Sequence, residues 1–246
     1  MSPLFVPDVW LTQTTSFPCY RLNGWKSEGG FGDEIAKLAG NGKSFFYAKI
    51  PTHDLSTSAL VTRAGFIIAD TNITLDWKDS AFHANLSVIV EEAQTAQFKP
   101  LQDMAARCFQ YSRFHLDPFF PNELANLIKR RWVENYCNRS RGSALYAAKI
   151  DDAVVGFLAA LVIEGDKENM AVIDLVGVAP EYQRRGVGFA LVRHFVDSWA
   201  GRVDKLRVGT QVANTASLKF YRRCGFEAAE SSYVFHGHYF DGVLVS

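Results

Sequence analysis

The chain has 246 residues and a mass of 27.5 kDa, which is enough for one large domain or two small ones. Hydrophobic residue types make up 48% of it and charged types 21%, values near the globular average that exclude a disordered or fibrous protein. Lysine plus arginine number 26, as do aspartate plus glutamate, so the formal net charge is zero. A nucleic-acid partner is therefore not expected, although a local cluster of arginines could still bind a small anion.

The cysteines lie far apart, without a C-x-x-C pair and without histidines at zinc-ligand spacing. We expect no disulfide framework and no metal site, and we interpret Cys19, Cys108, Cys137 and Cys224 as reduced core thiols. The first residues lack the pattern of a targeting peptide, and no segment has the ~20 apolar residues that cross a bilayer. A cytoplasmic protein without a membrane partner is expected.

The first predicted elements are a strand, a helix and a second strand. Residues 45–50 are apolar, residues 54–64 have a helical pattern, and residues 73–77 alternate as in a strand. Gly65 follows the helix, where a glycine can take the left-handed conformation that ends many helices.

The predicted domain boundary lies in the next segment. Residues 78–99 are polar and hold no clear period, and we place the boundary near Phe98. The chain is thereby divided into an N-terminal lobe of residues 1–98 and a second lobe of residues 99–246.

Two helices joined by a loop are predicted beyond the boundary. The first covers residues 101–109, and Asn122 is expected to cap the second. The loop between them, residues 112–121, holds two prolines and many polar and aromatic side chains, more than a minimal connector needs.

The remainder of the chain alternates strands with helices. Residues 145–150 and 154–163 predict an antiparallel hairpin, and residues 171–178 predict a strand that is buried on both faces. Two further helices are expected to end near Trp199 and Cys224, with a strand between them.

A strand–helix–Gly-Phe string occurs twice, with the Gly-Phe pairs at positions 65–66 and 225–226. Aligning these pairs sets Asp54 opposite Asn214 and Val61 opposite Tyr221. We interpret the two halves as related lobes, of which the first kept the scaffold and lost the polar residues. A chance match of short strings is the alternative.

A glycine-containing loop stands where the buried strand passes into a helix, with the sequence Gln183-Arg184-Arg185-Gly186-Val187-Gly188. Glycines let a ligand approach the backbone, and the free N–H groups of a helix start can bind a pyrophosphate. The arginines could add charge-assisted hydrogen bonds. A tight turn with two solvated arginines is the alternative for the loop taken alone.

Residues 176–188 and residues 214–226, with Asn214 and Tyr221, together resemble the acetyl-CoA-dependent GNAT acetyltransferases from about Leu101 to the C-terminus. The resemblance implies an α/β (α+β) fold with a central mixed, mostly antiparallel twisted sheet flanked by helices. It also implies acetyl-CoA as co-substrate without a metal, held by the strand through its pantetheine arm and by the loop through its pyrophosphate. The implied coenzyme-binding residues are Val176, Val178, Gln183, Arg184, Arg185, Gly186, Val187, Gly188, Phe189 and Asn214.

Residues 206–221, 112–118 and 46–51 look like the bacterial dTDP-fucosamine acetyltransferases. That closer resemblance implies a smaller, partial GNAT-like N-terminal lobe. It also implies N-acetylation of a 4-amino-4,6-dideoxy sugar on a nucleotide diphosphate, as in cell-surface polysaccharide biosynthesis. A homodimer is an open option for the assembly.

Tyr221 is the predicted general acid. A thiol with a pKa near ~8.5 is a fair leaving group, and a tyrosine hydroxyl near ~10 can protonate it at neutral pH. Asp174, the one acidic residue of the buried strand, is a candidate general base whose burial would raise its pKa. Water as the base, with Asp174 in a structural role, is the alternative. The N–H of Val176 is the expected oxyanion donor.

The loop of residues 112–121 is the leading candidate for the acceptor site, with Arg113 for a phosphate and with His115 and Asp117 for hydroxyls. A proline-bounded loop whose aspartate caps a turn is the alternative. We expect His236 and His238 to be surface residues, and residues 129–131 to form a solvated charged patch.

Two other functions stay open. One is an acetyltransferase for an amino acid, a polyamine or a protein N-terminal amine. The other is a non-catalytic acyl-CoA-binding sensor, which would keep the glycine loop and dispense with Tyr221. Because Arg113 suits an anionic acceptor and Tyr221 is present, the sequence favours an acetyltransferase for an amino sugar nucleotide.

Overall fold

A computed structural model describes residues 4–23, 30–79, 87–166 and 168–245. Part of the unpatterned segment at 78–99, namely residues 80–86, lies outside the described residues. The strands are β1 (Phe5–Pro7), β2 (Cys19–Leu22), β3 (Lys43–Pro51), β4 (Ile67–Trp77), β5 (Ile89–Glu92), β6 (Ala144–Ile150), β7 (Ala153–Ile163), β8 (Met170–Val178), β9 (Lys205–Gln211), β10 (Phe226–Phe240) and β11 (Val243–Leu244).

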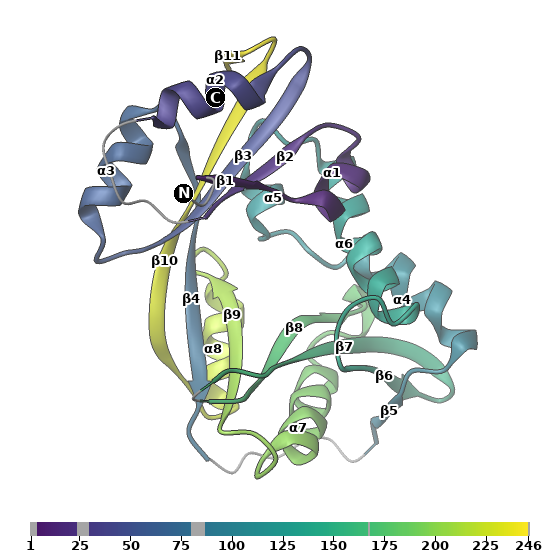
Figure 1. The fold of residues 1–246 in the computed structure, drawn as a ribbon. Helices are drawn as coiled ribbons and strands as arrows, with labels where there is room; N and C mark the ends of the chain where they lie inside the picture. Colours follow the sequence, from purple (N-terminus) through teal and green to yellow (C-terminus); the bar gives the residue numbers. More distant parts are fainter. Residues whose placement is uncertain (1–3, 24–29, 80–86, 167, 246) are drawn as a thin grey trace.

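The helices cover both faces of the strands and one end of the molecule (Figure 1). They are α1 (Val9–Thr15), α2 (Phe31–Ala39), α3 (Leu55–Arg63), α4 (Phe98–Ala105), α5 (Arg113–Leu116), α6 (Asn122–Cys137), α7 (Val187–Trp199) and α8 (Thr215–Arg223). Among the described residues, no helix is long and apolar enough to cross a membrane.

The described strands form one sheet in the order β1-β2-β3-β10-β4-β9-β8-β7-β6-β5, and β11 pairs with β10. The pairs β2/β3 and β8/β9 are parallel, and the other pairs are antiparallel. The mixed, mostly antiparallel sheet flanked by helices is therefore confirmed.

The predicted hairpin is present as β6 and β7, and its two turn residues, Asp151 and Asp152, have φ angles of 46° and 64°. A two-residue turn with positive φ at both positions matches the twist of paired strands. Two helix starts differ from the prediction. Helix α4 begins at Phe98, and α6 has Pro121 as its N-cap, so Asn122 is the first helical residue and not the cap.

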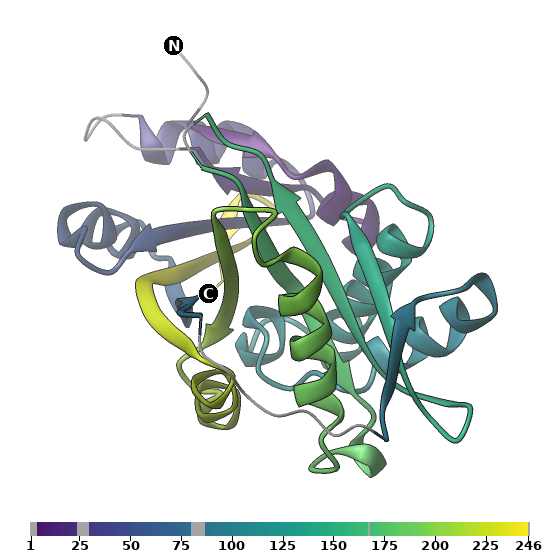
Figure 2. The same ribbon diagram turned by 90° about the horizontal axis from the view of Figure 1, so that it is seen from below.

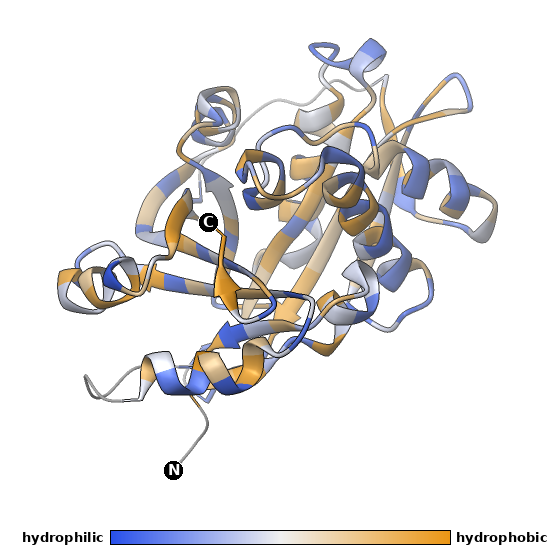
Figure 3. Ribbon diagram, turned by 90° about the horizontal axis from the view of Figure 1, so that it is seen from above, coloured by the Kyte–Doolittle hydropathy of each residue, from blue (hydrophilic) through white to orange (hydrophobic). Residues whose placement is uncertain are grey.

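Helices cover both faces of the second half of the sheet, and Figure 2 shows α7 lying against its strands. On that face, Leu191 and Phe195 of α7 pack with Leu158 of β7 in a fully buried cluster. On the opposite face, Val133 of α6 packs with Phe157. Neighbouring β7 residues thus serve two cores, in agreement with the hydrophobic colour of the strands in Figure 3.

The repeated string has the same local geometry in both halves. Asp54 and Asn214 are N-caps with φ/ψ of −85°/74° and −84°/67°, and each side chain accepts a hydrogen bond from the backbone N–H three residues later. Gly65 and Gly225 end the two helices with φ of 88° and 81°. The units β3-α3-β4 and β9-α8-β10 therefore share the same kind of N-cap, the same helix length and a left-handed glycine after the helix.

The two units interleave within the sheet. Strand β10 of the second unit lies between β3 and β4 of the first, and β4 lies between β9 and β10. Figure 1 shows β10 running alongside β4 through both halves of the molecule. Strands from both sides of Phe98 therefore share one continuous sheet. The domain boundary at Phe98 stays a prediction from the sequence.

Candidate active site

A cleft forms where two parallel strands separate. Strands β8 and β9 are paired only from Met170 and Lys205 to Ile173 and Val208, although β8 continues to Val178. Beyond that point β8 is held by β7 on its other edge. The backbone groups on the open edge of β8 are thus available to an extended ligand.

The cleft leads into a cavity of about 800 Å³. Its walls come from β8, β9, the glycine loop, α8, the segment after α4, and one residue of α6. Nearly all of the predicted coenzyme and catalytic residues line it, namely Asp174, Val176, Val178, Gln183, Arg184, Gly186, Gly188, Phe189, Asn214 and Tyr221. Two do not: Val187 is buried in the core, and Arg185 lies over the Tyr182 ring at 5.2 Å.

The glycine loop has the backbone of an anion cradle. Arg184 and Gly186 both have left-handed φ angles, of 63° and 86°. Gly186 is the N-cap of α7, and no side chain caps this helix start among the described residues. The first N–H groups of α7 therefore lack an intrahelical partner on the side of the cavity.

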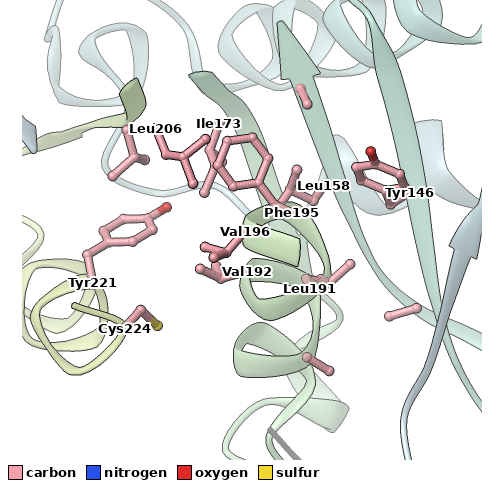
Figure 4. Packing of buried hydrophobic residues seen from close by; sticks show 14 of the residues in the cluster. Tyr146, Leu158, Ile173, Leu191, Val192, Phe195, Val196, Leu206, Tyr221 and Cys224 are labelled. Atoms are coloured by element: carbon pink, nitrogen blue, oxygen red, sulfur yellow. The ribbon is translucent and has the colours of Figure 1, made fainter. Parts of the chain in front are cut away.

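Helix α8 brings a tyrosine hydroxyl to the other wall. Tyr221 is 4% exposed and its hydroxyl has no hydrogen-bond partner among the described residues. Figure 4 shows its ring and Cys224 extending from α8 toward the residues of α7, β8 and β9. Burial, and then the nearby Cys224 thiol, raises the pKa of Tyr221, so the hydroxyl is protonated at neutral pH.

Asn214 and Gly188 fix how α8 meets the loop. The Asn214 side chain accepts a hydrogen bond from the Ser217 N–H at 3.1 Å, so it caps α8 while lining the cavity. A Cβ at Gly188 would lie 3.3 Å from the Phe220 ring. A glycine there lets the start of α7 approach α8 closely.

The Asp174 carboxylate already accepts hydrogen bonds from three protein side chains. It accepts hydrogen bonds from Trp132 Nε1 at 2.8 Å and Tyr136 Oη at 2.6 Å, and it forms a two-point ion pair with Arg141. Burial acts to raise its pKa, but hydrogen bonds and charge from Arg141, with Tyr136 and Trp132, outweigh it and hold the pKa below the usual value. The expectation of a raised pKa is wrong, and the geometry favours the structural alternative.

Within the described part of the chain, the loop of residues 112–121 reaches the cavity only at Ser112, and the predicted acceptor residues Arg113, His115 and Asp117 do not line it. His115 is hydrogen-bonded to Ser112 Oγ at 2.6 Å and to Asn126 Oδ1 at 3.0 Å. The Arg113 guanidinium stacks over the Tyr47 ring, 4.0 Å from its centroid. These side chains have protein partners, which favours a structural loop.

Asp117 joins this loop to β10. Its Oδ1 accepts from the Phe119 N–H at 2.9 Å, the capped turn foreseen as the alternative, and its Oδ2 lies 2.5 Å from His236 Nδ1 and 2.7 Å from His238 Nε2. Both histidines are buried, so the surface prediction is wrong. The three donors could hold a metal ion. The two imidazoles are also hydrogen-bonded to the Asp117 carboxylate, and Arg113 Nη1 lies 3.4 Å from His236 Nε2.

Lys129 is the residue that the sequence prediction misplaced most. The side chain expected in a solvated patch is 7% exposed and lines the cavity. Its position three residues before Trp132 and seven before Tyr136, on the apolar face of α6, is the signal that could have found it.

A cleft between parallel strands, closed by a glycine loop at a helix start, gives this α/β protein a site with the shape and the N–H groups that suit an anionic, extended ligand. The model of the acetyltransferase (GNAT) family matches residues 100–226, more than half of the chain, and the chain belongs to this family. Members of the family use acetyl-CoA as co-substrate.

Curated relatives are more distant. The spore coat polysaccharide biosynthesis protein SpsD of Bacillus subtilis is 27% identical over 54% of this chain and 45% of its own length. The L-amino acid N-acetyltransferase AaaT of Escherichia coli is 25% identical over 57% of this chain and 83% of its own length. The chain thus spans less than half the length of SpsD.

The whole fold also has relatives among solved structures. A tandem GNAT protein from the clavulanic acid biosynthesis pathway superposes with a TM-score of 0.60 at 11% identity, covering 89% of this chain and 75% of that chain. At this identity the likeness concerns the fold.

Proposed function

We propose that this protein is an acetyl-CoA-dependent N-acetyltransferase that acetylates the amine of a nucleotide-linked amino-deoxy sugar. One observation carries the proposal: the glycine loop, the open edge of β8 and Tyr221 share a single cavity. A coenzyme and an acceptor amine could therefore meet there in one ternary complex.

The coenzyme would follow the cleft. Its pyrophosphate would bind the N–H groups at the start of α7, with Arg184 beside them, and its pantetheine arm would pair with β8 at Val176 and Val178. The thioester would then lie near Asn214 and Tyr221. The uncapped helix start and the unpaired strand edge support this arrangement.

Transfer would take place by direct attack. The neutral acceptor amine attacks the thioester carbonyl, and the oxyanion is stabilised by the Val176 N–H. The N–C bond forms, the C–S bond breaks, and the departing sulfur takes the proton of the Tyr221 hydroxyl. Burial raises the pKa of Tyr221, and burial at the same place would also raise the pKa of the departing thiol. Because both pKa values rise, the proton transfer from Tyr221 to the sulfur is not disfavoured by burial.

The proton of the attacking amine would leave through water. Asp174 is a poor proton acceptor because Arg141 and two further donors hold its charge. An amine on a sugar ring is acidified by the neighbouring oxygens, so water suffices as its base.

The similarity to SpsD, a polysaccharide biosynthesis protein, supports an amino sugar acceptor, as does the sequence resemblance to dTDP-fucosamine acetyltransferases. The similarity to AaaT, which covers 83% of that protein, supports a second candidate: N-acetylation of an amino acid. Both acceptors carry an anionic group together with the amine.

A panel assay separates these candidates. Purified protein is incubated with acetyl-CoA and dTDP- or UDP-linked amino sugars, L-amino acids or polyamines, and thiol release and acetylated product are measured. The proposal predicts the highest kcat/KM for a nucleotide-linked amino sugar. An amino acid as the best acceptor would establish the second candidate, and coenzyme binding without turnover would indicate a sensor.

A further inference from the structure

Lys129 places a cation at the wall of the cavity. Its side chain extends from α6 between two aromatic rings, with Nζ 4.9 Å from the Phe109 ring centroid and 4.7 Å from that of Trp132. The residue is 7% exposed and lines the same cavity as Tyr221. Within the part of the chain that the structure describes, its ammonium group has no hydrogen bond and no ion pair.

The surroundings of Lys129 do not neutralise it. The groups that act on its charge are the Asp174 carboxylate, the Arg113 guanidinium and the Cys108 thiol. Arg141 already balances Asp174 in a two-point ion pair, and Arg113 adds a second positive charge. Burial lowers the pKa of Lys129 to about 8, so the ammonium group is charged in most molecules at pH 7.

A buried cation without a partner costs free energy that a merely structural residue would not need to carry. A leucine or methionine would fill the space between Phe109 and Trp132 without desolvating a charge. The aromatic faces stabilise the ammonium group but supply no hydrogen-bond acceptor. The geometry leaves its three N–H groups available to a ligand in the cavity.

We propose that Lys129 binds an oxyanion group of the acceptor, a phosphate or a carboxylate, and thereby selects anionic amines for acetylation. The inference rests on the proposed N-acetyltransferase function and names a specificity-determining residue for it. The coenzyme phosphates would occupy the glycine loop, where Gln183 and Gly186 line the cavity before α7, whereas Lys129 lines it from α6. Lys129 is therefore left for the second substrate.

Matched acceptors test the selection. Thiol release is measured for a dTDP-linked amino sugar against the free amino sugar, and for an L-amino acid against its amide. Wild type should prefer the anionic member of the pair it accepts by roughly 10- to 100-fold in kcat/KM. Lys129→Met should abolish the preference by raising KM for the anionic member, and Lys129→Arg should retain it.

Arg130→Met is the matched control, because Arg130 is the next residue of α6 and its side chain is 41% exposed. It should leave the preference unchanged. An undiminished preference in Lys129→Met would overturn the inference. The two pairs also distinguish the source of the oxyanion, since only one should show a preference that depends on Lys129.

A second measurement uses only the wild-type protein and does not depend on turnover. NMR of the wild-type protein labelled with ¹³C-lysine follows the titration of Lys129 with coenzyme A bound. Inorganic pyrophosphate or acetate should raise the pKa of Lys129, because an oxyanion favours the charged ammonium. An unchanged titration with both anions would refute the anion site. A raised pKa without acetylation of any acceptor would uphold the site and refute the proposed function.

Discussion

Tyr221 lines the cavity and its hydroxyl has no hydrogen-bond partner among the described residues, while the carboxylate of Asp174 accepts from three side chains. A group that must give up a proton to a ligand needs such freedom, whereas a group that anchors neighbouring elements does not. Asp174 holds Trp132, Tyr136 and Arg141 to β8, so it ties α6 to the sheet at the edge of the cavity.

Replacing Tyr221 with phenylalanine should remove the proton donor and keep the ring. We expect kcat to fall by about 10²–10⁴ with little change in KM for acetyl-CoA. Steady-state kinetics of thiol release measure both constants. Tyr146→Phe is the control, because Tyr146 is a buried tyrosine of the same core cluster that does not line the cavity. Equal kcat for wild type and Tyr221→Phe would remove Tyr221 from the mechanism.

Replacing Asp174 with asparagine should cost stability and leave the pH dependence of kcat/KM unshifted. The loss is about 3 kcal/mol, the low end for breaking a buried ion pair, because Arg141 is 37% exposed. The folded-state pKa of Asp174 is lowered, so its contribution is complete above the pKa of the unfolded chain and is lost as the pH falls through the folded value.

Urea unfolding between pH 3 and 7 measures the difference in the free energy of unfolding between wild type and Asp174→Asn. This difference should become smaller only at the acid end of the range. Asp197→Asn, at an exposed pair with Arg193, should change stability by less than about 0.5 kcal/mol. A pH–rate profile displaced by Asp174→Asn would restore Asp174 as the general base.

At the scale of single residues, sequence patterns predicted which residues lie at the cavity where that placement depends on the local backbone. Gly186, Gly188, Asn214 and Tyr221 belong to short strings around one helix start or one helix, and all of them line the cavity. The environments of Asp174 and His236 depend on hydrogen-bond partners at least 33 positions away, as in the pairs Arg141–Asp174 and Asp117–His236. No local period encodes such partners.

At the scale of elements, the glycine loop and α7 act together. Gly186 has a φ of 86°, where an alanine is strained, and it sets the direction of the first N–H groups of the helix. The glycine and the uncapped start of the helix both lie at the cavity, where a side chain on the loop would keep a ligand away from the N–H groups. Among the described residues no side chain caps α7, whereas α3 and α8 are capped by Asp54 and Asn214.

Replacing Gly186 with alanine should weaken acetyl-CoA binding by more than 10-fold and destabilise the protein by about 1–2 kcal/mol. Gly201→Ala is the control: Gly201 has a φ of 77° in a turn away from the cavity, so it should lose comparable stability and keep coenzyme affinity. Isothermal titration calorimetry measures the affinity. Equal affinities in the two variants would argue against a pyrophosphate at the start of α7.

At the scale of the whole molecule, the interleaving of the two units is the feature that the sequence did not reveal. The repeat predicted two related strand–helix–strand units, but only long-range pairing places β10 between β3 and β4. Gly237 of β10 lies against the Phe66 ring, where a Cβ would approach within 2.9 Å. The first unit contributes no described residue to the cavity lining, yet β4 holds β9 in place beside it.

This interleaving predicts that the chain unfolds in one cooperative step. Neither unit can lose its strands without exposing the edge of the other, because β10 is paired on both sides by the first unit. Calorimetry should give a calorimetric enthalpy equal to the van't Hoff enthalpy. Two resolved transitions would show that the lobes fold independently.

The most direct test of the account is two-substrate kinetics of thiol release, with acetyl-CoA and a dTDP-linked 4-amino-4,6-dideoxyhexose varied together. Direct attack in the cleft between β8 and β9 predicts release that depends on the acceptor, with reciprocal plots that intersect. Parallel plots would mean an acetylated enzyme intermediate, and release independent of every amine offered would contradict the proposed acetyl transfer.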